Sequence, residues 1–143
     1  MAYVIDTNIF NQLVDGKITP KNLPVDAPYI ATHIQIDEIN NTKNSERRAQ
    51  FFLMFAKIQA QIVPTESFVF DISRWDEGKW SDGQLFGKMK QELDFLNKSK
   101  SNNARDVLIS EVAIINGFTL ITADSDLATV TLNNGGKVIK FSP

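Results

Sequence analysis

Residues 1–10, Met-Ala-Tyr-Val-Ile-Asp-Thr-Asn-Ile-Phe, decide the fold of this chain. The apolar run from Met1 to Ile5 is typical of a short buried strand, and it stops on the carboxylate of Asp6. Apolar residues then recur at helical spacing, which predicts a short helix that ends at Val14. A buried strand that turns into a helix on a carboxylate places that carboxylate at the carboxyl edge of a sheet, where open α/β sheets bind ligands. Other acidic residues that reach Asp6 would make this edge a site.

The composition is that of an ordinary globular domain. The chain has 143 residues, 43% hydrophobic and 22% charged, which suits a single domain with a real core. No apolar run approaches the roughly 20 residues of a membrane helix, and Asp6 interrupts the layout of a signal peptide. Without cysteine and with one histidine, thiolate and multi-imidazole metal sites are excluded, and we expect a cytoplasmic protein. The net charge of −2 excludes a strong basic field, so contacts with nucleic acid must come from local patches.

Strands and helices alternate along the rest of the chain. Further strands are expected at Tyr29–Thr32, Gln61–Val63, Phe118–Thr122 and Lys137–Phe141. Further helices are expected at 33–39, 45–61, 85–96, 103–116 and 125–133. The segment 66–75 fits a strand or a helix, and the start signal at Pro64 and Thr65 favours the helix. The alternation predicts one α/β domain over 1–143, a three-layer α/β/α sandwich with a mostly parallel central sheet of four to five strands.

The predicted helix at 45–61 has a wider apolar face than one core contact needs. Phe51, Phe55, Ile58 and Ile62 follow one face, and residues 52–54 extend it. Two interpretations stay open: the helix is deeply embedded in the core, or its outer side contacts a partner or a second subunit. The second interpretation makes a homodimer plausible.

Three further acidic residues occupy positions like that of Asp6. Glu38 lies early in a helix that follows a strand, Asp106 lies in the first turn of a helix, and Asp124 directly follows a strand. Strand ends and helix starts of a parallel sheet share one edge, so all three can converge on Asp6. Each also has a simpler interpretation, as a helix cap, a favourable charge at a helix N-terminus or a solvated side chain.

Four carboxylates in one cleft would have a definite chemistry. They repel each other and raise one another's pKa values, so such a cluster is stable when a cation neutralises it. Oxygen ligands without histidine or cysteine select hard cations, Mg²⁺ or Mn²⁺. Two such ions would bind a phosphodiester, lower the pKa of a bound water and stabilise the leaving oxygen. The acidic set therefore predicts metal-dependent phosphodiester hydrolysis without a separate general base.

Four stretches, in this order, resemble the motifs of the PIN-domain ribonucleases. They are Asp-Thr-Asn at 6–8, Ile-Asp-Glu-Ile at 36–39, Arg-Asp-Val-Leu-Ile-Ser-Glu-Val-Ala at 105–113 and Gly-Phe-Thr-Leu-Ile-Thr-Ala-Asp-Ser-Asp-Leu at 117–127. Any one motif is weakly specific, but four in order in the expected strand and helix contexts are fairly specific. The resemblance covers essentially the whole chain, and the chain length is similar to that of small prokaryotic members, including the VapC-type toxins of toxin–antitoxin pairs.

The resemblance implies a Mg²⁺- or Mn²⁺-dependent endoribonuclease that cleaves RNA by water attack and leaves a 5′-phosphate and a 3′-hydroxyl. Carried over by position, Asp6, Glu38, Asp106 and Asp124 would be the catalytic acids that hold the metal ions. The family also implies a homodimer and, for a toxin, a cognate antitoxin protein. Two alternatives stay open, a structure-specific DNA nuclease and a catalytically silent PIN-like binding module, although the intact set of acids disfavours the second.

The resemblance extends to supporting residues. Asp126 matches an additional acid, expected to support the site or to bind a second metal ion, and Asn8 and Thr122 match polar positions that support the acids or the phosphate. Several basic residues are candidates for phosphate contacts, and Arg105, beside Asp106, has the best case. The other candidates are Lys43, Arg47, Arg48, Lys98 and Lys100.

One stretch departs from the family's pattern. Residues 101–104, Ser-Asn-Asn-Ala, precede the third motif where the family usually has a more hydrophobic or glycine-containing approach. The region 76–103 is therefore where this protein differs, and we expect substrate choice to depend on that region and on the loop at 15–28.

Overall fold

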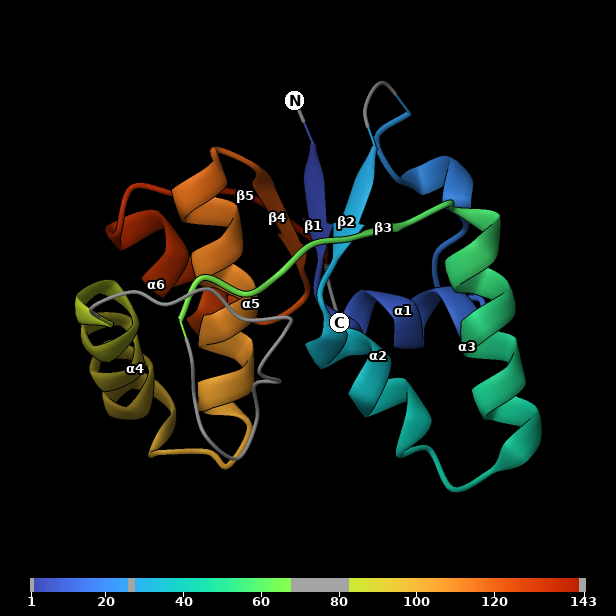
Figure 1. Ribbon diagram of the computed structural model, residues 1–143, viewed down its shortest axis with the longest axis horizontal. Coiled ribbons are helices and arrows are strands. Elements are labelled where there is room, and N and C mark those ends of the chain that lie inside the picture. Colours follow the sequence, from blue (N-terminus) through green and yellow to red (C-terminus); the bar gives the residue numbers. More distant parts are fainter. Residues whose placement is uncertain (1, 26–27, 68–82, 142–143) are drawn as a thin grey trace.

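The computed structural model describes residues 2–25, 28–67 and 83–141. Within these ranges, five parallel strands form one sheet in the order β3-β2-β1-β4-β5 (Figure 1). The strands are β1 (Tyr3–Ile5), β2 (Tyr29–Ala31), β3 (Gln61–Ile62), β4 (Thr119–Thr122) and β5 (Lys137–Lys140). The helices are α1 (Thr7–Val14), α2 (His33–Asn40), α3 (Ser45–Lys57), α4 (Gln84–Asn97), α5 (Asn103–Asn116) and α6 (Ser125–Asn133), and Pro20–Asn22 is a short 3₁₀ helix.

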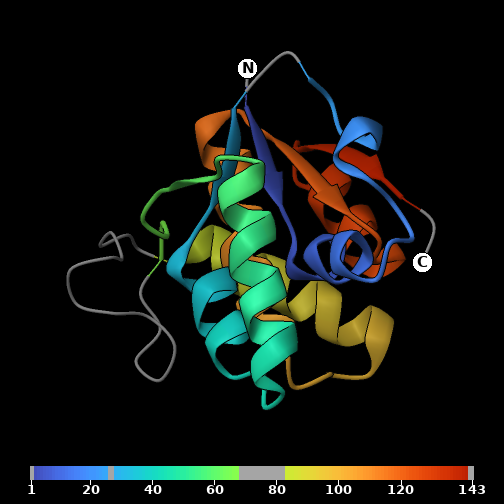
Figure 2. The same cartoon turned by 90° about the vertical axis from the view of Figure 1, so that its right-hand side faces the viewer.

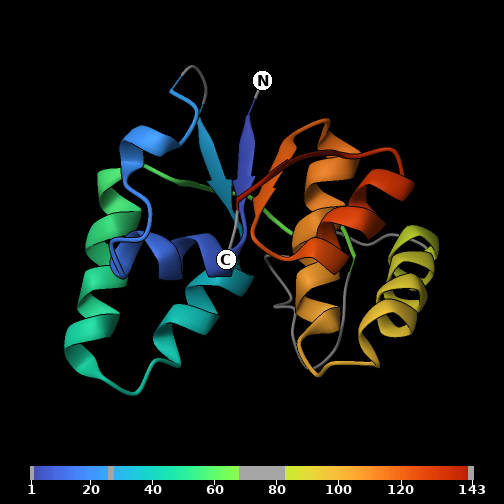
Figure 3. The ribbon, with the colours of Figure 1, turned by 180° about the vertical axis from the view of Figure 1, so that it is seen from behind.

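Helices cover both faces of the sheet. Figure 1 shows α4, α5 and α6 on one side and α1 and α3 on the other, and Figure 3 shows the same division from behind. In Figure 2, which looks onto the second side, α3 lies in front of the strands. The predicted three-layer α/β/α sandwich with a parallel sheet is confirmed.

The strands divide the core between the two faces by their period of two. Val4 of β1 and Leu120 of β4 pack in the cluster that contains α4, α5 and α6. Their neighbours Ile5 and Ile121 pack in the opposite cluster, with α1 and α3. All four side chains are fully buried, which explains why β1 and β4 are continuous apolar runs rather than alternating ones.

Helix α2 is fixed at the carboxyl edge of the sheet by a buried capping box. Thr32 accepts a hydrogen bond from the Ile34 N–H at 3.1 Å, and the Gln35 side chain accepts one from the Thr32 N–H at 2.8 Å. Gln35 also donates to the backbone oxygen of Ile5 at 2.9 Å. This last bond ties α2 to the end of β1, which sets the position of Glu38, on α2, relative to Asp6.

Helix α3 ends earlier than its apolar pattern predicts. It stops at Lys57 rather than at 61, because Gln59 adopts a left-handed conformation with φ of 55° and the chain then enters β3. Ile62 was expected on the core face of this helix, but it lies in the edge strand β3 and is 51% exposed.

The apolar face of α3 serves the core with its inner residues. Phe51 is buried, and Phe55 stacks on Phe10 of α1 with 5.6 Å between the ring centroids. Phe52 and Leu53 stay 37% and 70% exposed. The core interpretation is therefore confirmed for the inner residues, whereas the two exposed side chains keep the interface interpretation as a prediction.

One further predicted helix is confirmed, and another lies mostly outside the described residues. Helix α5 has the predicted bounds and ends on Gly117, whose φ of 71° is the left-handed conformation of a helix C-terminus. The expected helix at 66–75 falls, from residue 68 on, outside the described residues, and so do both tryptophans. Within the described ranges, no helix has the length and apolar character that a membrane span requires.

Candidate active site

The four predicted acids meet at the point where the strand order reverses. From β1 the chain builds β2 and β3 on one side, and later β4 and β5 on the other. Asp6, Glu38, Asp106 and Asp124 all line one pocket of about 220 Å³ at the carboxyl edge of the sheet. Such a switch point is where open α/β sheets bind ligands, so the predicted convergence on Asp6 is what the structure shows.

Asp6 is the most deeply embedded of these acids, with only 3% of its surface exposed. It is the N-cap of α1, and its Oδ1 accepts a hydrogen bond from the Thr7 N–H at 2.8 Å. Its Oδ2 accepts one from the hydroxyl of Thr122 at 2.7 Å. The simple interpretation of Asp6 as a helix cap is therefore correct, and it coexists with a place in the acidic pocket.

Thr122 links Asp6 to the loop that carries Asp124. Its Oγ1 accepts a hydrogen bond from the Asp124 N–H at 3.0 Å while it donates to Asp6. Asn8 supports the same loop, because its Oδ1 accepts from the Ala123 N–H at 3.1 Å. The predicted supporting positions of Asn8 and Thr122 thus lie beside the acids, where they hold the end of β1 against the end of β4.

Asp124 is the N-cap of α6. Its Oδ1 accepts hydrogen bonds from the N–H groups of Asp126 and Leu127 at 2.9 Å and 3.1 Å. Both bonds are to one oxygen, so the cap leaves Oδ2 for another contact. Asp106, in the first turn of α5, also lies where a helix N-terminus favours negative charge.

The electrostatics of the pocket disfavour charge on three of the acids. Burial is the main cause in each case, and it raises the pKa of Asp6 to about 6, helped by the charge of Asp124. Burial and then the charge of Asp6 raise the pKa of Glu38 to about 7. The pKa of Asp106 rises to about 8, through burial and then the charges of Asp6, Glu38 and Asp124. A cation in the pocket would reverse these shifts, because it favours the charged forms.

The donor set fits a hard divalent cation, although the side chains do not form a finished chelate. The pocket offers carboxylate oxygens, and Oε1 of Glu38 is a buried oxygen with no hydrogen-bond partner in the described structure. Oxygen-only sites suit Mg²⁺ or Mn²⁺. Across the described ranges, however, no group of three or more acidic or imidazole side chains is arranged to hold a metal ion.

Two predicted residues lie outside the pocket lining. Arg105 does not line it, yet its charge lowers the pKa of both Glu38 and Asp106. Asp126, in the first turn of α6, does not line it either. The phosphate contact of Arg105 and the metal role of Asp126 stay predictions.

The lining contains polar residues that the motifs did not single out. Asn11 belongs to α1, and its i, i+4 spacing from Thr7 of the first motif places both residues on one face of that helix. Lys100 and Asn102 belong to the connection between α4 and α5. The spacing in α1 was a usable signal, whereas no periodicity brings a loop residue to a pocket.

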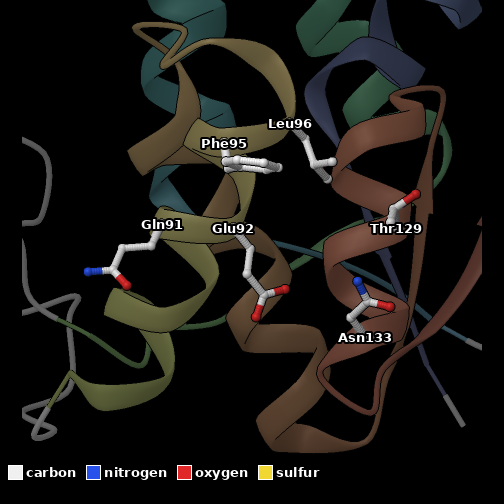
Figure 4. Close-up of a pocket in the computed structure, with 6 residues that line it drawn as sticks. All are labelled: Gln91, Glu92, Phe95, Leu96, Thr129 and Asn133. Atoms are coloured by element: carbon white, nitrogen blue, oxygen red, sulfur yellow. The ribbon is translucent and has the colours of Figure 1, made fainter.

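A larger groove lies elsewhere, between α4 and α6. It measures about 580 Å³ and contains none of the four acids. Figure 4 shows Phe95 and Leu96 on α4 facing Thr129 and Asn133 on α6. Phe95 is 87% exposed. This apolar groove carries none of the chemistry predicted from the motifs.

The fold is similar to that of toxin–antitoxin proteins. With VapBC2 from Rickettsia felis, solved bound to a DNA fragment from its promoter, the TM-score is 0.65 at 18% identity, over 98% of each chain. A domain of a functionally unknown protein from Methanocaldococcus jannaschii gives 0.56 at 15% identity, over 99% of this chain and 91% of that one. FitAcB from Neisseria gonorrhoeae gives 0.51 at 10% identity, over 96% of each chain. No protein-family model and no curated protein matches the sequence.

A parallel α/β/α sandwich with a carboxylate-lined pocket at its switch point is the class that the fold and the pocket define. Within that class, this chain has a VapC-like PIN fold. At 10–18% identity the likeness establishes the fold, and the activity has to be inferred from the site.

Proposed function

We propose that this protein is a metal-dependent endoribonuclease. The observation that carries the proposal is the convergence of Asp6, Glu38, Asp106 and Asp124 on one pocket at the switch point of a VapC-like PIN fold. The raised pKa values of three of these acids support it, because the pocket holds more acidic groups than it can ionise unaided. A site that disfavours its own charge is suited to divalent cations and, through them, to a polyanionic substrate.

In such a site the four acids would bind the metal ions, and Thr122 and Asn8 would position the acids. The four carboxylates would hold one or two Mg²⁺ or Mn²⁺ ions, which supply water activation and stabilisation of the leaving oxygen. Thr122 orients Asp6 through its donated hydrogen bond, and Asn8 fixes the loop of Asp124. Because the metal chemistry lowers the pKa of water, no histidine base is required, which agrees with the buried position of His33 at the start of α2, outside the pocket lining.

The purified protein is expected to cut single-stranded RNA when Mg²⁺ or Mn²⁺ is present and to lose this activity in EDTA. Single-stranded RNA, structured RNA, and single-stranded and duplex DNA of the same sequence are incubated side by side, and the products are resolved on denaturing gels. The products should carry 5′-phosphates. Preferential cutting of DNA would establish the alternative DNA nuclease, and no cutting of any substrate with either metal would remove the enzymatic proposal.

We further propose that the enzyme acts as the toxin of a toxin–antitoxin pair. The support is the overall similarity to VapBC2, a VapBC toxin–antitoxin structure bound to a DNA fragment from its promoter. Expression of the wild-type chain should then arrest growth within a few generations, and co-expression of a small neighbouring gene should restore it. Expression without any growth defect, in a host where the protein is soluble and cuts RNA in extracts, would rule out the toxin role while leaving the nuclease in place.

We also propose a homodimer, as expected from the apolar face of α3. The support is the pair Phe52 and Leu53, which stay exposed, and the small groove of about 220 Å³ that α3 forms with α1 beside Leu53. Exposed apolar clusters of this kind are typical of interfaces between chains.

A further inference from the structure

The connection between α4 and α5, residues 98–102, forms one rim of the acidic pocket. Two of its residues, Lys100 and Asn102, line the pocket together with the four acids. This connection overlaps residues 101–104, the stretch whose sequence differs from what usually precedes the family's third motif. It brings a positive charge to a pocket whose other ionisable lining residues are all carboxylates.

A pair of hydrogen-bonded asparagines, Asn97 and Asn103, holds this connection in place. Asn103 is 1% exposed, and its Nδ2 donates to Oδ1 of Asp94 and to Oδ1 of Asn97, both at 2.7 Å. Asn97 donates back to Oδ1 of Asn103 at 2.8 Å. The end of α4 is therefore joined to the start of α5 by side chains that have no role in the acidic pocket.

The backbone of the connection is also defined. Lys98 and Ser99 both adopt left-handed conformations, with φ of 60° and 59°, which non-glycine residues adopt only where the surroundings enforce it. The Ser99 N–H donates to the backbone oxygen of Asp94 at 3.0 Å, and the Asn103 N–H donates to the backbone oxygen of Lys100 at 3.1 Å. The turn that carries Lys100 therefore has a defined backbone conformation.

Lys100 lines the pocket but is not ion-paired with its acids in the described part of the chain. The charge of Arg105 lowers the pKa values of Glu38 and Asp106. In the part of the chain that the structure describes, Lys100 forms no ion pair. Asn102, at the N-cap position of α5, makes no side-chain capping bond, so its amide is likewise not committed to the helix.

We propose that Lys100 and Asn102 form the edge of the site that binds the RNA backbone, with Lys100 as a contact to a phosphate next to the one that is cut. Asn102 adds a hydrogen-bond donor at the same rim, and Asn97 and Asn103 are positioning residues that act through Lys100. This inference rests on the proposed ribonuclease function. Phosphate contacts by lysine strengthen binding without reading the sequence, so Lys100 contributes affinity and register rather than base specificity.

The test compares Lys100→Gln with Lys98→Gln, two exposed lysines of the same turn of which only one lines the pocket. Steady-state cleavage of a single-stranded RNA is measured between 50 and 200 mM salt. For Lys100→Gln we expect KM to rise about threefold to tenfold with kcat almost unchanged, and the slope of log KM against log salt to fall by about 0.7, the value of one phosphate contact on a single strand. Lys100→Arg should keep the wild-type KM, and Lys98→Gln should change neither quantity.

The positioning role is tested in the Asn97→Ala background, because Asn97 is half-buried and its loss should leave α5 folded. There the effect of Lys100→Gln on KM should largely disappear, since the lysine is no longer held at the rim. An undiminished effect would overturn the positioning role. Equal KM values for Lys100→Gln and Lys98→Gln, in an enzyme that cuts RNA, would overturn the inference alone, whereas a wild type that cuts no RNA would overturn the proposed function with it.

Discussion

Replacing Asp6 by asparagine is expected to abolish RNA cleavage and to leave the fold intact. Asp6 contributes to the raised pKa values of both Glu38 and Asp106, so it is the acid at the centre of the pocket. An amide has the same shape and can still accept the bond from the Thr7 N–H, but it lacks the charge that a divalent cation requires. Loss of metal-held charge stabilisation corresponds to a rate decrease of about a thousandfold or more.

The matched control for this variant is Asp15→Asn. Asp15 lies at the other end of α1, where it is exposed, paired with Arg47 at 2.7 Å and not part of the pocket lining. Its loss should change the cleavage rate by less than about twofold, because an exposed ion pair contributes little. Circular dichroism and thermal melting verify that both variants are folded. If Asp6→Asn cuts RNA as fast as wild type, Asp6 has no part in catalysis.

The central elements of the fold could be predicted because their signals are local. A strand that stops on Asp6, and a helix that ends on Gly117, each carry their boundary in the residues themselves. The acidic convergence followed from topology alone, because parallel strands end at one edge. The predicted end of α3 was wrong. The apolar pattern continues through Ile58, but the chain turns at Gln59 and then pairs β3 with β2.

The rim of the pocket could not be predicted in the same way. Lys100 is one of several exposed lysines in the sequence, and its position depends on the hydrogen bonds between Asn97 and Asn103, six residues apart on two helices. A separation of six residues is not a helical repeat, so the helical pattern does not bring those two asparagines together. Arg105 had the better case because it adjoins Asp106, yet neighbours in a helix point about 100° apart, and it is Asp106 that lines the pocket.

The metal-free protein is expected to lose stability as the pH rises from 5.5 to 8.5. The folded-state pKa values of Asp6, Glu38 and Asp106, about 6, 7 and 8, all lie above their ordinary values of 3.8, 4.5 and 3.8. The folded state therefore holds protons more tightly than the unfolded state. The stability from these groups is complete below about pH 4 and is lost as the pH rises through 6 to 8.

The expected size of this loss makes it measurable by thermal melting. Three coupled shifts of this kind correspond to at least about 3 kcal/mol of unfolding free energy, or on the order of 10 °C in Tm for a chain of this length. Added Mg²⁺ or Mn²⁺ should restore most of the Tm at pH 8.5, because a ligand that binds only the folded state stabilises it. A metal-free Tm that is constant or rises over this range would show that the acids do not crowd one another.

The variant Asp106→Asn tests whether the charge of one acid in the pocket causes the loss of stability at high pH. Asp106 has the highest pKa of the set, so removing its charge should make the metal-free protein more stable than wild type at pH 8.5, and more stable by a smaller margin at pH 5.5. The same variant should lose most of the stabilisation by Mn²⁺. Glu46→Gln, an exposed acid in the first turn of α3, should reproduce the wild-type response to both pH and metal. A gain in stability without metal, together with a smaller stabilisation by metal, would show that Asp106 destabilises the metal-free fold and helps to bind the cation.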